Sequence, residues 1–510
     1  MKGCKYNLCI PLRLFWEKSF SLGIVPQFYK SQQIIPIHKK GAKTKAQNFR
    51  PISLTSHIIK IFERILRRVL SDYFESNNLI NSNQHGFRKN HSCSTQLLSH
   101  TYNILSNFIN GNEVDTIYID YSKAFDKVDH NLLLKKLQHY GVTGKYIDWI
   151  KAFLKGRNQV VQVNGACSYP TPVNSGVPQG SVLGPLLFII YINDLTNTIT
   201  DSHILTFADD TKIITEIHQP RDTSILQSDL NRVIEWSQKN KMELNNDKFE
   251  LICHRANKNS KNIELLKELP FSSEFSVYDV SSDIQISPSP FVKDLGIYIT
   301  SDLNWDVHIT KCCKKATQVS AWILHVFYTR NKEVMLTLFN SLVRSLLEYC
   351  PEVWNPYKKK NIVLIEQVQR SFTSKINGMK ELNYWERLAK LNILSLQRRR
   401  ERMLIIIVWK IKNGLYPNSI NLQFKLNRRP AFIKADLQPM PTEPGLRNKF
   451  DNSFVIKAAK LWNKLPPYLT YVTDLVAFKA GLDKFLIDIP DLPPIPGYPT
   501  QGRTNSITEY

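Results

Sequence analysis

Three aspartates stand where apolar runs end, in positions suited to holding metal ions. Asp120 follows the run 116–119, and the pair Asp209-Asp210 follows the run 205–207. Nucleotidyl transfer needs two divalent ions about 3.5–4 Å apart, which activate a hydroxyl and neutralise a leaving pyrophosphate. Carboxylates are the hard oxygen ligands that Mg²⁺ prefers, and Mn²⁺ accepts them too. We therefore predict Asp120 and Asp209 as catalytic ligands shared by two Mg²⁺ ions, with Asp210 as a weaker or outer ligand.

The segments around the aspartates supply groups that could hold a nucleotide. Gly180, in Pro178-Gln179-Gly180, lets the backbone approach a substrate closely, and Gln179 can hydrogen-bond a nucleotide. Phe125 lies five residues after Asp120, where a ring beneath the incoming sugar would exclude a 2′-hydroxyl and select deoxynucleotides. Two alternatives stay open. An Asp-Asp pair can be simple turn chemistry, and Phe125 can be an ordinary core aromatic.

Cationic side chains that could contact phosphates occur in several places. Arg50 suits bidentate binding of triphosphate oxygens. Lys248 could protonate the leaving pyrophosphate, although an exposed lysine explains it equally well. Arg88, beside an aromatic, could contact the template backbone. Lys43 and Lys45 belong to a basic loop suited to triphosphate, template or primer phosphates, with a solvated charge run as the alternative.

The composition favours a folded protein that binds a polyanion. The chain has 510 residues, 43% of them hydrophobic, and 67 Lys+Arg against 44 Asp+Glu give a net charge of +23. At this length we expect two to four domains, and a basic surplus of this size favours phosphate binding by counterion release. The eight cysteines, Cys4 included, lack metal-ligand spacing, and no secretory signal or bilayer-spanning run is visible. We expect reduced thiols and an intracellular protein, in the nucleus or the cytoplasm.

Hydrophobic periodicity predicts the elements that position these residues. We expect a buried strand over 116–119 and a hairpin around 205–214, which would carry the aspartates to one place. Asp129 should cap a helix that reaches residue 140. Further predictions are strands over 33–38, 159–163 and 291–299, the last broken by Gly296. We also expect amphipathic or buried helices over 58–69, 182–192, 334–349, 362–376 and 396–412, and a solvated proline-rich tail. The basic helices beyond residue 300, with arginines 398, 399, 400 and 402, are expected to grip a nucleic-acid duplex.

With these residues in place, the chain resembles the reverse transcriptases of non-LTR (LINE, jockey-type) retrotransposons. The resemblance rests on motifs in the family's order, which include Gln84-His85-Gly86-Phe87-Arg88, Ser175-Gly176-Val177-Pro178-Gln179-Gly180-Ser181 and Phe207-Ala208-Asp209-Asp210-Thr211-Lys212. Segments 35–41, 48–54, 120–128, 294–297, 348–354 and 461–466, with Trp305, also match. The likeness therefore covers roughly residues 15–487.

The resemblance implies an α+β right-hand polymerase fold, with fingers, a palm built on an antiparallel sheet, a helical thumb and a mostly helical C-terminal region. The implied boundaries are 1–19 for an N-terminal extension, 20–300 for fingers and palm, 301–415 for the thumb, 416–487 for the C-terminal region and 488–510 for a flexible tail. The family's metal carboxylates correspond to Asp120, Asp209 and Asp210, its sugar-discriminating position to Phe125 and its nucleotide contact to Gln179.

The expected activity is synthesis of DNA on an RNA or DNA template, with dNTPs as substrates and a DNA primer at the target. Relatives usually carry an endonuclease upstream; none is recognisable in this chain, nor is an RNase H domain. We therefore expect the chain not to nick its own target. Two other functions stay open. One is a catalytically dead relic that only binds nucleic acid, and the other is an RNA-dependent RNA polymerase or intron maturase.

Overall fold

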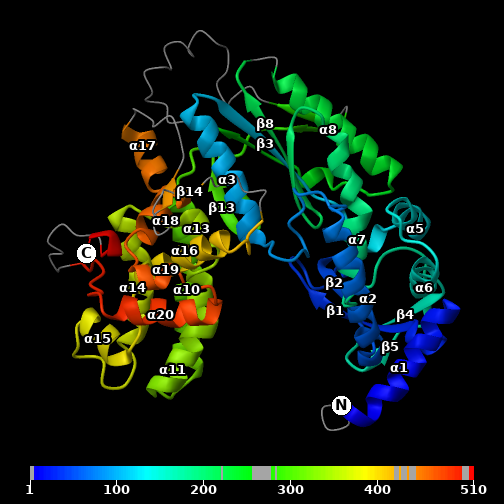
Figure 1. Ribbon diagram of the computed structural model, residues 1–510, viewed down its shortest axis with the longest axis horizontal. Coiled ribbons are helices and arrows are strands. Elements are labelled where there is room, and N and C mark those ends of the chain that lie inside the picture. The colour runs from blue at the N-terminus through cyan, green and yellow to red at the C-terminus, as the bar shows by residue number, and fades with distance from the viewer. Residues whose placement is uncertain are drawn as a thin grey trace.

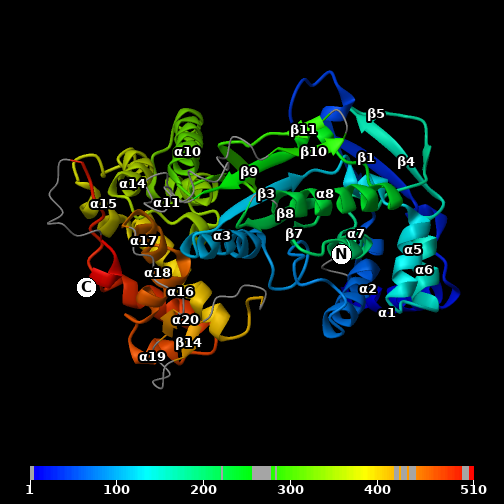
Figure 2. The same ribbon diagram turned by 90° about the horizontal axis from the view of Figure 1, so that it is seen from above.

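A computed structural model describes residues 5–219, 222–255, 277–281, 284–417, 424–426, 433–435, 444–496 and 505–509. Figure 1 shows the C-terminal helices gathered on one side of the molecule and α1, α2, α5 and α6 on the other, with β3, β8 and α3 between them. The view from above places β4 and β5 far from α14 and α15 (Figure 2). Cys4 lies outside the described residues, and no disulfide joins the cysteines within them.

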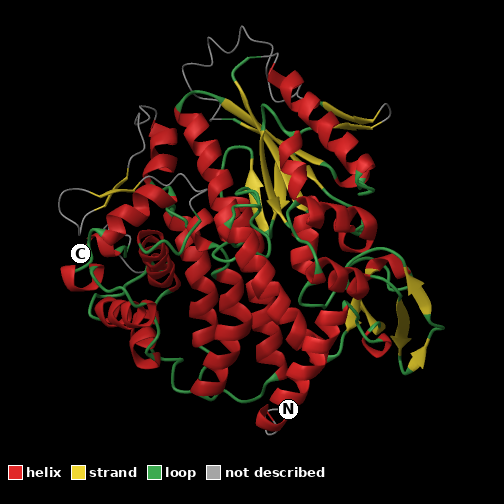
Figure 3. Cartoon of the chain, turned by 45° about the vertical axis from the view of Figure 1, so that its right-hand side comes forward, coloured by secondary structure: helices red, strands yellow, loops and turns green. Residues whose placement is uncertain are grey.

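A four-stranded antiparallel sheet lies at the centre of the first 255 residues. Its order is β7-β8-β3-β9, formed by β3 (Glu113–Ile119), β7 (His203–Phe207), β8 (Asp210–Ile217) and β9 (Glu250–His254). The predicted strand over 116–119 and the hairpin around 205–214 are confirmed as β3 and β7–β8. Figure 3 shows these strands grouped together with helices packed around them.

Both faces of this sheet are buried, because successive residues of a strand point to opposite sides. Ile213 packs with α7 (Gly184–Ile192) and α8 (Asp222–Lys239) in one apolar core, while Ile214 packs with α3 (Cys93–Ile109) in another. The predicted buried helix over 182–192 is confirmed as α7. This second core also contains C-terminal residues such as Trp354 and Trp462. The domain limits at 300 and 415 therefore remain predictions, since one core crosses them.

A second sheet and several helices complete the N-terminal half. Strand β1 (Ser31–His38) pairs antiparallel with β2 (Phe49–Leu54) and parallel with β4 (Arg157–Val163), which also pairs with β5 (Ala166–Cys167) and β6 (Thr171–Val173). The helices are α1 (Lys5–Leu22), α2 (His57–Ser76), α4 (Ala124–Lys127), α5 (His130–His139) and α6 (Lys145–Leu154). Asp129 caps α5, as predicted, by accepting hydrogen bonds from the amides of Asn131 and Leu132.

The C-terminal half consists mainly of helices. They are α10 (Asp306–Val326), α11 (Lys332–Leu338), α12 (Arg344–Leu347), α13 (Pro351–Trp354), α14 (Lys359–Thr373), α15 (Tyr384–Leu391), α16 (Leu396–Lys412), α17 (Pro444–Asp451), α18 (Phe454–Trp462), α19 (Pro467–Thr470) and α20 (Leu475–Ile487). A π-helical segment, Phe339–Val343, joins α11 to α12. Small hairpins are β10 (Tyr278–Ser281) with β11 (Ile284–Ile286), β12 (Phe291–Asp294) with β13 (Ile297–Thr300), and β14 (Phe424–Leu426) with β15 (Ile433–Ala435).

Three expectations differ from the structure. The strand over 291–299 is interrupted at Gly296 as expected, but it forms a hairpin of two strands, β12 and β13, because Leu295 and Gly296 both have positive φ and turn the chain back. Arg398 and Arg400 of α16 are fully buried and therefore cannot grip a duplex. Their neighbours Arg399 and Arg402 are ion-paired with Glu348 and Asp483.

The expected solvated tail is the third difference. Ile495 packs against Tyr384 and Leu388 of α15, and Asn505 and Ile507 are each only 1% exposed. Asp491 accepts hydrogen bonds from the backbone amide and the hydroxyl of Ser395 at the start of α16. The described parts of the tail, 488–496 and 505–509, are therefore a structural element that covers α15 and α16.

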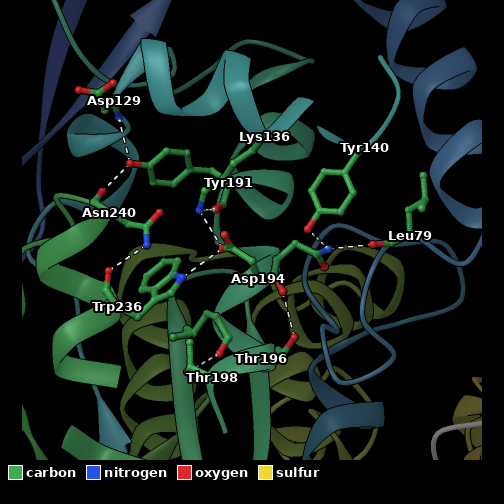
Figure 4. Close-up of polar contacts among 12 residues, drawn as sticks. Leu79, Asp129, Lys136, Tyr140, Tyr191, Asp194, Thr196, Thr198, Trp236 and Asn240 are labelled. Carbon is green, nitrogen blue, oxygen red and sulfur yellow. Dashed lines mark hydrogen bonds and ion pairs between the residues drawn. The ribbon is translucent and has the colours of Figure 1, made fainter. Parts of the chain in front are cut away.

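A polar cluster at the end of α7 holds α5, α7 and α8 together (Figure 4). Lys136 of α5 donates to Asp194 at 2.8 Å and to the carbonyl of Tyr191 at 2.7 Å, and the Trp236 indole of α8 donates to the same Asp194 carboxylate at 3.1 Å. The Lys136 ammonium also lies 4.7 Å and 5.0 Å from the centroids of the Tyr191 and Trp236 rings. These contacts fix α5 and α8 to the end of α7.

Glu63 of α2 secures the other end of α7. This fully buried carboxylate accepts hydrogen bonds from the amides of Val182 and Leu183, at 2.6 and 2.9 Å. Burial raises the pKa of Glu63, although these two amides favour its ionised form. One side chain thus supplies the acceptor for two amides at the start of a buried helix.

We predict that Glu63→Ala lowers the free energy of unfolding by about 2–4 kcal/mol, because two buried amides lose their acceptor. Glu63→Gln should cost less, since its carbonyl oxygen can still accept. Urea denaturation measures both, with the exposed Glu17→Ala as the control, where a change under about 0.5 kcal/mol is expected. Equal effects of Glu63→Ala and Glu17→Ala would show that the cap contributes nothing.

Candidate active site

The strand register brings two of the three aspartates to the same end of the central sheet. Ile119 of β3 pairs with Thr211 of β8, so the next step of this antiparallel register places Asp120 opposite Asp210. Asp209 belongs to the turn between β7 and β8, where Phe207 pairs with Asp210. The charge of Asp120 acts on both Asp209 and Asp210. Three carboxylates predicted to act together therefore share one end of the sheet.

Crowding of negative charge perturbs these carboxyl groups. Burial and the charges of Asp209, Asp294 and Asp120 together raise the pKa of Asp210 to about 6, although its side chain still reaches solvent. Burial and the Asp120 charge also raise the pKa of Asp209, which Lys39 and Arg50 oppose. Such a site is favourable for cations, because a bound cation would relieve the repulsion.

The turn that carries Asp209 is held by a segment from far upstream. The Gln84 side-chain oxygen accepts hydrogen bonds from the amides of Gly86 and Ala208, at 2.6 and 2.9 Å. Ala208 has a φ of 55°, and a Cβ on Gly86 would lie 2.4 Å from its nitrogen. Only glycine at residue 86 allows this approach. The structure thus gives Gln84 a positioning role that no local sequence signal identified.

Asp120 has a lysine as its partner. The Lys248 ammonium lies 2.5 Å from its carboxylate, and the Asn245 side chain donates to the same oxygen at 3.2 Å. Asn245 also donates its backbone amide to the carbonyl of Asp120 at 2.9 Å. Lys248 was predicted as a proton donor to pyrophosphate. In this structure its charge offsets that of Asp120.

The carboxylates do not form a ready-made metal site. Within the ranges described, no three His, Cys, Asp or Glu side chains are grouped closely enough to hold an ion. Lys248 is paired with the Asp120 carboxylate, and the charges of Asp120 and Asp209 both act on Asp210. The donor set nevertheless suits a hard divalent cation, since it consists of carboxylate oxygens.

The predicted Pro-Gln-Gly loop connects the central sheet region to β2. Gly180 has a φ of +119°, and a Cβ there would lie 2.5 Å from the carbonyl oxygen of Ser53. The Ser53 amide donates to the Gln179 carbonyl at 2.7 Å, and the Gln179 side chain donates to Asp126 at 3.0 Å. Gly180 therefore serves a close backbone approach within the protein, and Gln179 is held beside Phe125.

Phe125 is half-buried next to this loop. Its ring stacks on Phe188 of α7 with centroids 4.2 Å apart and an interplanar angle of 13°, and the Phe87 ring lies 6.1 Å away. The backbone carbonyl of Phe125 accepts from the amide of Val177 at 2.8 Å. Core packing fixes one side of the Phe125 ring, as expected for a core aromatic. The role of the ring in selecting the sugar stays a prediction.

The cationic residues divide into two groups. Lys43, Lys45 and Arg50 are exposed on the β1–β2 hairpin, and Arg50 acts electrostatically on Asp209. Arg88 differs, because its side chain is 9% exposed and its guanidinium donates to both oxygens of Glu75, at 2.9 and 2.7 Å. It also donates to the Asn81 carbonyl at 2.8 Å. These contacts make Arg88 a support of the 81–88 segment and leave it unavailable to a template.

The structure has an antiparallel sheet with acidic residues at one end and helices on both faces. A basic β-hairpin lies beside the acidic end, and the C-terminal half is helical. Together these features define the right-hand class of nucleic-acid polymerases. Residues 37–283 match the family model described as "Reverse transcriptase (RNA-dependent DNA polymerase)". Over these residues the chain is similar to the reverse transcriptase family, and its sequence is also similar to RNA-directed DNA polymerases of mobile elements. Reverse transcriptases as a family use divalent metal ions.

Two curated relatives come from Drosophila melanogaster. The RNA-directed DNA polymerase from mobile element jockey is 28% identical over 381 residues, which are 72% of this chain and 40% of the relative. The probable RNA-directed DNA polymerase from transposon BS is 27% identical over 382 residues, with the same coverages. The chain thus spans about two fifths of the length of these relatives.

Solved structures with a similar course of the chain are telomerases. Apo telomerase from Candida tropicalis superposes with a TM-score of 0.43 at 13% identity, covering 80% of this chain and 72% of that one. Telomerase from Candida albicans in complex with a fragment of telomeric RNA gives a TM-score of 0.39 at 10% identity, covering 72% and 68%. None of the helices in the described ranges is both long and apolar enough to cross a membrane.

We predict that Asp210→Asn stabilises the metal-free protein at neutral pH. Between the ordinary carboxyl pKa of 3.8 and about 6, the folded protein binds the Asp210 proton more tightly than the unfolded chain does. Stability therefore falls as pH rises through this window, and a neutral Asn avoids the loss. Discounted for the solvent exposure of Asp210, the expected gain at pH 7 is about 1 kcal/mol.

Urea denaturation in EDTA at pH 7 and pH 4 measures this difference. The gain should be present at pH 7 and nearly absent at pH 4, where Asp210 is protonated in most folded molecules. Asp201→Asn, an exposed aspartate before β7, is the control and should show no such pH dependence. A gain of the same size at both pH values would contradict the electrostatic explanation.

Proposed function

We propose that this chain is an RNA-directed DNA polymerase that transfers deoxynucleotides to a primer 3′-hydroxyl. The observation that carries the proposal is the convergence of Asp120, Asp209 and Asp210 at one end of the central sheet, beside the exposed basic hairpin that bears Arg50. Acidic residues alone would repel a triphosphate. The cationic hairpin on the other side makes the region suitable for a substrate that carries both phosphates and metal ions.

In the proposed site, Asp120 and Asp209 would hold two Mg²⁺ ions, with Asp210 further out. When bound, the ions would lower the pKa of the 3′-hydroxyl and neutralise the pyrophosphate as it leaves. The Lys248 ammonium, 2.5 Å from the Asp120 carboxylate, would be near enough to the site to donate a proton to the pyrophosphate, which is its predicted role.

The nucleotide would lie between the central sheet and the β1–β2 hairpin. Arg50 binds triphosphate oxygens, while Gln179 and Gly180 shape the wall that faces the base and sugar. Phe125, held against Phe188, presents its free ring edge to the sugar and excludes a 2′-hydroxyl. Lys43 and Lys45 contact phosphates of the template or primer.

The proposed macromolecular partners are an RNA template and a DNA primer. The support is the net charge of +23 together with the likeness to RNA-directed DNA polymerases. The complete set of Asp120, Asp209, Asp210, Gln179 and Arg50 favours an enzyme over a relic that only binds nucleic acid.

We predict that Asp209→Asn reduces primer extension on poly(rA)/oligo(dT) with Mg²⁺ by at least about a hundredfold. A lost anionic ligand removes several kcal/mol of charge stabilisation in the transition state. EDTA should abolish extension by the unchanged protein. Asp201→Asn is the matched control and should extend normally. RNA binding in gel shifts should survive Asp209→Asn, and full extension by this variant would refute the site.

We predict that Phe125→Val raises the ratio of ribonucleotide to deoxynucleotide incorporation by about tenfold or more. Relieving a steric exclusion of a hydroxyl is worth roughly 1–3 kcal/mol in discrimination. Single-nucleotide addition with rNTP and dNTP measures the ratio, which a general loss of activity does not change. Phe87→Val, at the neighbouring aromatic, is the control. An unchanged ratio for Phe125→Val would show that the Phe125 ring only packs in the core and does not select the sugar.

A further inference from the structure

A fully buried ion pair lies two residues beyond the aspartate turn. The Lys212 ammonium of β8 is bonded to the Asp294 carboxylate of β12, and the two side chains are 2% and 5% exposed. The Lys212 ammonium also lies 5.5 Å from the centroid of the Tyr118 ring, on the β3 residue that pairs with Lys212 across the sheet. A buried pair is costly to desolvate and often contributes little stability. Its placement therefore calls for a reason other than stability.

Strand geometry relates this pair to the aspartates. Residues two apart in a strand project to the same face, so Lys212 and Asp210 lie on the face of β8 that also carries Ile214. Ile214 packs in one core with Ile297 and Ile299 of the β12–β13 hairpin. Asp294, in turn, is close enough to Asp210 for its charge to raise the pKa of Asp210. The hairpin thus packs beside the carboxylates, with Lys212 as the connection.

The hairpin is tied to the palm differently at its two ends. Near its base, the amide of Arg255 donates to the Ser301 carbonyl at 3.1 Å, and the amide of Ser289 donates to Leu251 at 2.8 Å. At its tip, Lys212 binds Asp294 from the sheet side. From the helical side, the Tyr349 hydroxyl donates to the Leu295 carbonyl at 2.9 Å, and its ring lies 3.2 Å from where a Cβ on Gly296 would be.

The tip is also an unusual turn. Leu295 has a φ of 44° and Gly296 a φ of 93°, which are conformations that a leucine rarely adopts without support. The two side chains that bind Asp294 and Leu295 come from parts of the chain separated by more than a hundred residues, Lys212 and Tyr349. The tip is therefore held between the aspartate turn and the C-terminal helices.

We propose that Lys212, Asp294 and Tyr349 are positioning residues that set the distance between the β12–β13 tip and the catalytic aspartates. This proposal rests on the proposed polymerase function, since the tip packs beside Asp210 on one face of the sheet, where the end of a bound primer would lie. The Lys212–Asp294 pair fixes the tip to the strand that carries Asp210. Tyr349 transmits the position of the C-terminal helices to the same tip.

The test separates positioning from stability with an apolar replacement. The double variant Lys212→Met/Asp294→Leu replaces both charged groups with apolar side chains of similar shape and leaves no buried charge unpaired. Its thermal midpoint should stay near that of the unchanged protein, and its affinity for primer–template should stay within about twofold, because the phosphate-binding surfaces are elsewhere. We expect kcat for single-nucleotide addition to fall by about ten- to a hundredfold, because a small misplacement of reacting groups has effects of this size.

A second measurement does not depend on activity. Amide hydrogen exchange at residues 294–297 should become faster in the double variant, because the tip loses its contact with β8. Tyr349→Phe removes the hydroxyl that donates to Leu295 and also interacts with Cys93 and Cys350, and it should lower kcat in the same direction by about threefold. Lys212→Arg retains the positive charge and should recover much of the activity that Lys212→Met loses.

The matched control is the Lys136–Asp194 pair of Figure 4, which lies on the other side of the sheet against α7 and α8. Lys136→Met/Asp194→Leu should leave kcat per folded molecule unchanged. Unchanged kcat and unchanged exchange at 294–297 in the Lys212/Asp294 variant would overturn the inference, as would equal effects of the two double variants. If the unchanged protein extends no primer, the polymerase proposal fails and the positioning role fails with it. Faster exchange at 294–297 would then show only that the Lys212–Asp294 pair holds the tip.

Discussion

Repulsion among three carboxylates is the constraint on which this structure depends. The β3–β8 register places Asp120 opposite Asp210, and like charges placed in this way repel each other. The strands tolerate this because an apolar core holds their register; Ile117 and Ile213, which pair across the sheet, are completely buried. The acidic end is thus held in place by a core that does not itself take part in chemistry.

Compensating positive charge arrives from outside the sheet. Lys248 neutralises Asp120 directly, while Lys39 and Arg50 act on Asp209 from the β1–β2 hairpin. Gly86 and Gly180 each lie against other main-chain atoms, where a side chain would collide. Gly86 thereby allows close packing against the β7–β8 turn, and Gly180 allows close packing against the β1–β2 hairpin. Electrostatic balance in this region consequently depends on two glycines that carry no charge.

The sequence allowed prediction of those features that local pattern determines. Apolar runs bounded by turn residues located β3, β7–β8 and α7, and Asp129 was identified as the cap of α5 from its position before an amphipathic stretch. Features that depend on distant contacts were missed. Nothing near Gln84 shows that its side chain holds Ala208, and nothing near Arg88 shows that Glu75 occupies its guanidinium. The break at Gly296 was expected, but the reversal into a hairpin was missed, because a leucine with positive φ has no sequence signature.

The basic composition shows the same limit of sequence reasoning. Counting arginines in 398–402 suggested a nucleic-acid surface, yet Arg398 donates to the carbonyls of Pro490 and Asn505 and Arg400 to the side chain of Asn355. Arg398 holds the tail against α16 and Arg400 is bonded to the residue that follows α13, so neither can release counterions from a phosphate backbone. In the proposed complex, phosphate contact would come from cations that remain exposed, such as Lys43 and Lys45 on the β1–β2 hairpin and Lys314 and Lys315 on α10. The net charge therefore overstates the nucleic-acid surface, and part of the surplus serves to join the C-terminal helices.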